Sequence, residues 1–237
     1  MVIMKTDLGR IEKWIKEAWE KLAEETNKSR WVQWTEAAAI TYPLYYQLER
    51  LRNKHNVDPR IIVIPQFRFT VPVRAECGNE THYKGYERKE RAVYYDLAIV
   101  RFEKGIPTLP TRGMLPKENW CFIWCFKPRP LVLFEAKFID ELGNLGEDFE
   151  KDFKKLEKAF GWKNNAPKRA YLCIRYRENG EKLTMKLVPR GSESKLKHIR
   201  VAEIVAENKR YKPYIWPYKE WRKIRFRANG KGKRKEK

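Results

Sequence analysis

Several familiar residue patterns are missing from this chain of 237 residues. It has only three histidines, His55, His82 and His198, and they lack the close spacing of a metal site. Its four cysteines form neither the paired C-x2-C pattern of a zinc site nor a dense disulfide framework. No apolar run approaches the roughly 18 residues that span a bilayer, and the N-terminus does not read as a secretory signal. We therefore expect a cytoplasmic protein with no membrane partner.

Positive charge is what the chain has in excess. Lys and Arg total 52 against 31 Asp and Glu, a net charge of +21. Such an excess attracts phosphate polyanions or acidic membrane surfaces, and without a membrane segment it favours a nucleic-acid partner, with DNA the first expectation. Abundant Lys, Arg and Glu beside only three Gln are also typical of a hyperthermophile, which concerns habitat and not chemistry.

Hydrophobic periodicity predicts an α/β fold. Residues 7–26 read as an amphipathic helix, and a second helix starts near Thr35 and contains Pro43, which would kink or split it. Pro65 marks the first strand as an outer or bent one. The later elements are strands at 60–73, 92–102 and 130–138, a helix at 147–160, a strand at 169–177, and short strands at 181–188 and 198–205. The order is α, βββ, α, β, with a mixed central sheet flanked by helices.

Three additions to a core of residues 34–207 are predicted. Residues 1–33 form an added N-terminal helix. Residues 103–129 put far more chain between two neighbouring strands than a hairpin needs, and are read as an insertion. Segment 208–237 has 13 basic and 2 acidic residues, so it supplies +11 of the net charge, and it is read as a basic C-terminal arm. Its aromatic residues would either stack on nucleic-acid bases or dock the segment onto the core.

The run LVLFEAKF at 131–138 places two opposite charges inside an apolar strand. Burying even polar groups without partners costs about 2–7 kcal/mol, so these charges need a reason to be there. Alternate residues of a strand share a face, so Glu135 and Lys137 should point the same way. Asp96 is a lone charge in the run YYDLAIV, and paired strands lie only about 4.8 Å apart. Two carboxylates and an ammonium would then meet, and Mg²⁺, or Mn²⁺ in its place, is the counter-ion that suits them.

Asp96 in YYDLAIV, followed by Glu135 and Lys137 in LVLFEAKF, resembles the D…(D/E)xK signature of the PD-(D/E)xK nuclease superfamily, which has the restriction-endonuclease-like fold. The pattern [DE]xK occurs five times in the chain, but only at Glu135 does it lie in an apolar run. The resemblance implies an αβββαβ core and a metal-dependent endonuclease that hydrolyses DNA. It implies that Asp96 and Glu135 are metal ligands and that Lys137 orients the attacking water.

The resemblance also implies helix-borne site residues. Many members add a glutamate from the first core helix to the metal site; Glu36 is the best-placed match and Glu49 the runner-up. The helix at 147–160 offers Asp152 and Lys155, of which Lys155 is assigned to the catalytic set. Nucleic-acid contacts are expected from Lys151, Lys154 and Lys158 on this helix and from Arg222, Arg225 and Arg227 near the C-terminus.

Three alternatives remain open at the level of sequence. The charged residues could form a buried ion cluster without a catalytic role. The chain could be a non-catalytic nucleic-acid-binding accessory protein with a nuclease-like fold, or a relative that cleaves RNA. A homodimer would suit a double-strand cut.

Overall fold

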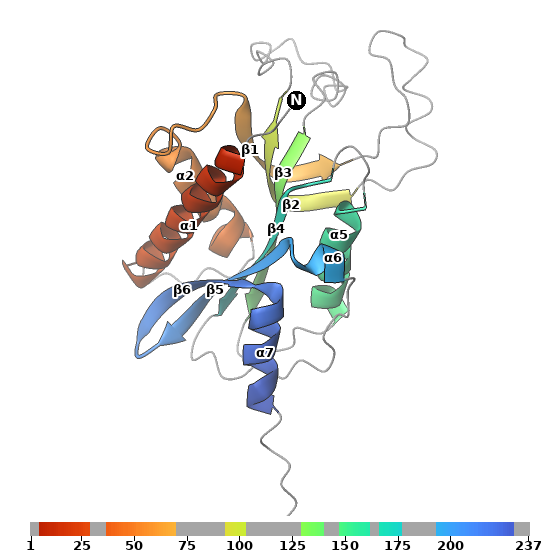
Figure 1. The fold of residues 1–237 in the computed structure, drawn as a ribbon. Helices are drawn as coiled ribbons and strands as arrows, with labels where there is room; N and C mark the ends of the chain where they lie inside the picture. Colours follow the sequence, from red (N-terminus) through yellow and green to blue (C-terminus); the bar gives the residue numbers. More distant parts are fainter. Residues whose placement is uncertain are drawn as a thin grey trace, which may run out of the picture.

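The chain forms an α/β protein with a six-stranded mixed sheet (Figure 1). The computed structural model describes residues 5–28, 37–69, 93–102, 129–139, 147–161, 166–176 and 193–229. The strands lie in the sheet in chain order: β1 (Ile61–Phe69), β2 (Val93–Arg101), β3 (Arg129–Ile139), β4 (Arg169–Tyr176), β5 (Ile199–Glu207) and β6 (Arg210–Pro217). The pairs β3–β4 and β4–β5 are parallel and the other three are antiparallel.

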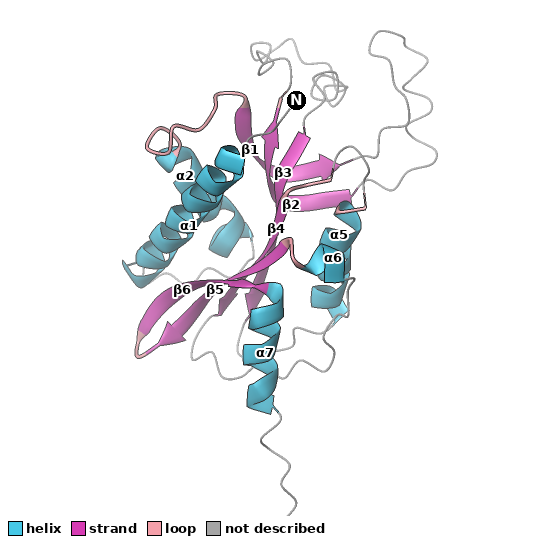
Figure 2. Cartoon of the chain, in the orientation of Figure 1, coloured by secondary structure: helices cyan, strands magenta, loops and turns pink. Residues whose placement is uncertain are grey.

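Helices cover both faces of this sheet, as Figure 2 shows. One face packs against α1 (Lys5–Lys28), the short π-helix η1 (Ala37–Thr41) and α2 (Tyr42–Leu51). The other packs against α5 (Glu147–Ala159), α6 (Glu193–Leu196) and α7 (Tyr218–Asn229). Successive strand residues point to opposite faces, so the sheet supplies apolar side chains to two separate cores. The predicted α/β class, mixed sheet and N-terminal helix are thus confirmed.

Prolines mark the ends and edges of the elements. Pro43 lies in the first turn of α2, where its missing N–H has no helical partner to lose, and the chain divides there into η1 and α2. Pro65 lies in β1, which is an edge strand as the sequence predicts. The other edge, β6, contains Pro213 and Pro217. Each edge therefore lacks some of the N–H donors that an added strand would need.

The segment that follows residue 207 belongs to the fold as far as residue 229. Asn208 and Lys209 have φ values of 51° and 64°, in the left-handed region that a tight β5–β6 turn requires. In α7, Tyr218 and Trp221 are fully buried. The ring of Trp221 stacks on Phe149 of α5 at 5.7 Å between ring centroids, and its Nε1 donates a hydrogen bond to Glu203 at 2.8 Å. These aromatic residues dock the segment onto the core.

Some predicted features lie outside the described residues. These are Glu36, residues 103–128 of the insertion, the short strand at 181–188 and the end of the chain at 230–237. Among the helices that the structure describes, none has the length and apolar character needed to cross a membrane.

Docking of α7 gives a first testable prediction. Trp221→Ala removes a fully buried ring and its hydrogen bond to Glu203, so we expect the free energy of unfolding to fall by about 3–5 kcal/mol. Ile224→Ala, on the same helix but 46% exposed, should change it by no more than about 0.5 kcal/mol. Urea unfolding measures both; equal, small effects would show that α7 does not stabilise the fold.

Candidate active site

The candidate site lies where β2 and β3 separate. Their ladder ends at Leu97 opposite Phe134, so Asp96 and Glu135 are the first residues beyond it, on facing positions of the two strands. Oδ2 of Asp96 accepts a hydrogen bond from the backbone N–H of Ala136 at 2.8 Å. A side chain thus replaces the next strand-to-strand bond and fixes the Asp96 carboxylate beside β3.

A local break in strand alternation accompanies this separation. Leu97 packs in the core on the α1 side, so regular alternation would place Tyr95 there too, yet Tyr95 packs in the core on the α5 side. On the neighbouring strand β1, Pro65 faces Leu97 and Phe67 faces Tyr95. Gln66 between them has a φ of 52°, a left-handed conformation that rotates the chain at this point. The Tyr95 hydroxyl then donates to the backbone oxygen of Lys155 in α5 at 3.4 Å. Asp96 is therefore the residue of β2 at which the regular alternation of side chains between the two faces of the sheet is interrupted.

Glu135 is a buried carboxylate with one ion-pair partner in the described part of the chain. Its side chain is 2% exposed, and its Oε2 lies 2.6 Å from the ammonium of Lys155. Among the described residues, no group donates a hydrogen bond to its other oxygen, Oε1. Burial raises the pKa of Glu135 well above its usual range; the positive charge of Lys155 opposes this shift, and the negative charge of Asp96 adds to it. A buried, half-satisfied carboxylate is costly unless a ligand completes it, so Oε1 is a candidate cation ligand.

Asp152 of α5 joins the two lysines of the site. Its Oδ2 pairs with Lys137 at 2.8 Å, and its Oδ1 lies 3.4 Å from Lys155. The charges therefore alternate along Glu135, Lys155, Asp152 and Lys137. The sequence offers Asp152 beside Lys155, because their spacing of three residues places both on one side of a helix, but it assigned a site role to Lys155 alone.

The structure thus brings together four of the five predicted catalytic residues: Asp96, Glu135, Lys137 and Lys155. The fifth, Glu36, precedes η1 and lies outside the described residues. The runner-up Glu49 lies on α2, where it pairs with Arg52 at 3.8 Å.

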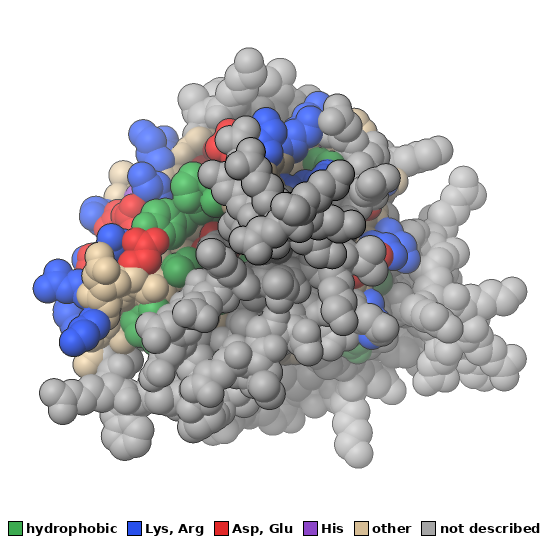
Figure 3. Space-filling model, turned by 90° about the horizontal axis from the view of Figure 1, so that it is seen from below, with side chains coloured by type: hydrophobic (Ala, Val, Ile, Leu, Met, Phe, Trp, Pro, Cys, Tyr) green, Lys and Arg blue, Asp and Glu red, His purple; other side chains and the backbone are tan. Residues whose placement is uncertain are grey.

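The residues predicted to contact nucleic acid lie on α5 and α7. Lys151, Lys154 and Lys158 are exposed, and Lys154 pairs with Glu150 at 2.6 Å. Arg222 is half-buried on α7, while the side chains of Arg225 and Arg227 lie outside the described ones. Figure 3 shows basic and acidic side chains next to each other on the described part of one face, so this part of the surface is of mixed charge.

The described site offers two carboxylates, those of Asp96 and Glu135, as possible ligands of a metal ion. Among the residues that the structure describes, no group of three or more His, Cys, Asp and Glu is arranged to hold one. Mg²⁺ nevertheless binds through one or two carboxylates when water and substrate phosphate supply its other ligands. Asp96 and Oε1 of Glu135, to which no described residue donates, fit that mode of binding.

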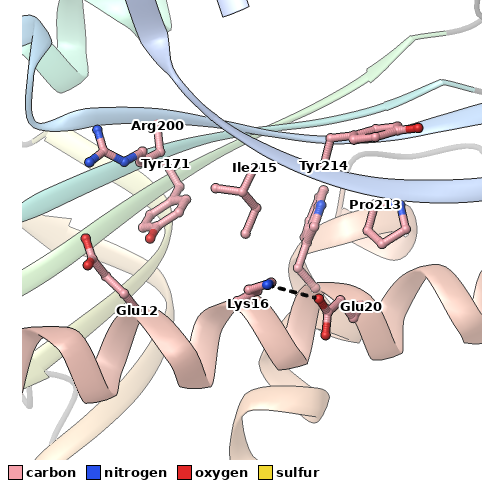
Figure 4. A pocket seen from close by; sticks show the side chains of 9 residues that line it. Glu12, Lys16, Glu20, Tyr171, Arg200, Pro213, Tyr214 and Ile215 are labelled. Carbon is pink, nitrogen blue, oxygen red and sulfur yellow. Dashed lines mark ion pairs between the residues drawn. The ribbon is translucent and has the colours of Figure 1, made fainter. Parts of the chain in front are cut away.

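A separate cavity of about 310 Å³ lies on the other face of the sheet, between α1 and strands β4 to β6 (Figure 4). Its walls combine Trp19, Tyr171 and Ile215 with charged groups of both signs, among them Lys16 and Glu20, which pair at 3.8 Å. None of the residues predicted for the active site lines it. Its position and its balanced charge give no reason to connect it with the carboxylates.

Comparison with known proteins finds no family model that matches this chain and no similar curated protein or solved structure. The activity therefore has to be inferred from the sequence and the structure of this chain.

The raised pKa of Glu135 predicts how stability depends on pH. The folded state keeps the Glu135 proton above pH about 4.3, where the unfolded chain has lost it, so this residue stabilises the fold at low pH and that stability is lost as pH rises. In EDTA, we expect the melting temperature of Glu135→Gln to rise relative to that of the wild type as the pH is increased above about 4.3. A constant difference across this range would contradict the assignment of a raised pKa.

Proposed function

We propose that this protein is a metal-dependent endonuclease of the PD-(D/E)xK type that hydrolyses DNA. The observation that carries the proposal is the pair Asp96 and Glu135 at the point where β2 and β3 part, with a buried oxygen of Glu135 unpartnered among the described residues. Lys137 and Lys155 lie within the same cluster.

Two further features support the proposal. The described elements from residue 42 to residue 176 run in the order α2, β1, β2, β3, α5, β4, which is the αβββαβ order that the resemblance implies. The net charge of +21 suits a polyanionic substrate.

The carboxylates of Asp96 and Glu135 would hold Mg²⁺ or Mn²⁺, with Glu36 as a further candidate ligand. When bound, such an ion polarises a phosphoryl group and lowers the pKa of a bound water. The remaining chemistry belongs to the chain's own residues.

Each of those residues has a distinct task. The Ala136 amide orients Asp96 through its hydrogen bond. Lys155 holds Oε2 of Glu135 and offsets part of its charge, which leaves Oε1 available as a ligand. Lys137 is the ammonium that can hold the attacking water or stabilise negative charge on the phosphate in the transition state. Preorganised charges of this kind act strongly because they do not have to reorient during the reaction.

The test is a cleavage assay with the wild type, Asp96→Ala and Lys137→Ala. Labelled duplex, single-stranded and branched DNA, and RNA, are incubated with Mg²⁺, Mn²⁺ or EDTA. We expect cutting of DNA that requires the metal and falls by at least about 10²-fold in either variant. Asp58→Asn is the matched control, because Asp58 pairs with Arg60 and Arg101 away from the cluster and should leave the rate unchanged.

Other outcomes are equally informative. Cutting that survives both substitutions would refute the site assignment. Metal-dependent cutting of RNA alone would favour the RNA-cleaving relative. Salt-sensitive binding without cutting would favour the non-catalytic accessory protein.

A further inference from the structure

When the carboxylates of the site are ionised, as cation binding requires, its described charges do not cancel. Asp96, Glu135 and Asp152 then carry three negative charges, and Lys137 and Lys155 carry two positive ones. Without Asp152, the two ammonium groups would equal the charge of Asp96 and Glu135. A fully neutralised pair of carboxylates has little electrostatic attraction for a divalent cation.

Asp152 is placed to change this balance. One of its oxygens holds Lys137 at 2.8 Å while the other faces Lys155 at 3.4 Å. Lys137 lies two residues after Glu135 on β3, so both side chains are on the same face of the strand. The ammonium of Lys137 nevertheless pairs with Asp152 of α5 and with neither Asp96 nor Glu135 among the ion pairs of the described residues. No described lysine or arginine lies within ion-pair distance of Asp96, whose carboxylate is held by the Ala136 amide.

We propose that Asp152 is a positioning residue: by holding Lys137, it leaves the Asp96 and Glu135 pair with net negative charge and so able to bind a divalent cation. This inference rests on the proposed function. In this role Asp152 contacts neither the ion nor the reacting phosphate.

The simpler reading is that Asp152 makes an ordinary helix ion pair. Such pairs on exposed surfaces contribute about 0–1 kcal/mol and would not affect metal affinity. Asp152 and Lys137 are both only 17% exposed in their side chains, and they link α5 to the strand that bears Glu135. Residues that orient or balance metal ligands without touching the metal typically change metal affinity by about 10–100-fold.

The experiment measures binding of Mn²⁺ alone by isothermal titration calorimetry at neutral pH. We expect Asp152→Asn to weaken the Kd by about 10–100-fold relative to the wild type. Glu150→Gln is the matched control, because it removes the same charge from the same helix at a residue paired with Lys154, and its Kd should stay within about twofold.

The double variant Asp152→Asn with Lys137→Met separates charge balance from structural damage. Removing Lys137 takes away the ammonium that loses its Asp152 partner in Asp152→Asn, so Mn²⁺ affinity should return to within about threefold of the wild type. DNA cleavage should not return, because Lys137 is itself in the catalytic set. A merely structural role for Asp152 predicts no such rescue.

The outcomes distinguish the two proposals. Equal Mn²⁺ affinity in the wild type and Asp152→Asn, or a double variant as weak as Asp152→Asn, would overturn the role of Asp152 and leave the nuclease proposal standing. A wild-type protein that binds no Mn²⁺ and cuts no DNA would overturn both.

Discussion

A carboxylate buried in a sheet needs a positive partner, and Glu135 finds one in Lys155 at 2.6 Å. Burial pushes this carboxylate toward its neutral form, and the ammonium opposes that push. The pairing satisfies one oxygen and leaves the other without a described partner. The arrangement of the site depends on this contact, because the ion pair forms only when α5 packs against β3 with Lys155 next to Glu135.

That position of α5 is set by apolar packing. Phe149 and Phe153 are fully buried, and they meet Trp221 and Tyr218 of α7. The C-terminal segment therefore supports the helix that carries Asp152 and Lys155. A segment whose composition suggests a basic arm thus contributes to the geometry of the carboxylate site.

The sequence predicted well those features that depend on local pattern. Helical spacing of apolar residues predicted α1 and α5, and Pro65 predicted an edge strand because proline cannot donate to a neighbouring strand. It also drew attention to Glu135 and Asp96, since lone charges in apolar strands are costly. Strand β6 and helix α7 were harder to predict, because dense Lys and Arg hide the few aromatic residues that become buried.

The sequence by itself determined the α, βββ, α, β order of the core elements and the charged residues that an apolar strand must accommodate, because both follow from neighbours in the chain. Only the tertiary structure decided which of these charges meet. The hydrogen bond of Asp96 to Ala136 and the pairing of Asp152 with Lys137 depend on strand register and on how α5 packs. A charged residue on an amphipathic helix looks the same in sequence whether it faces water or a buried carboxylate, so the sequence offered Asp152 as a polar residue of this helix but could not predict its pairing with Lys137.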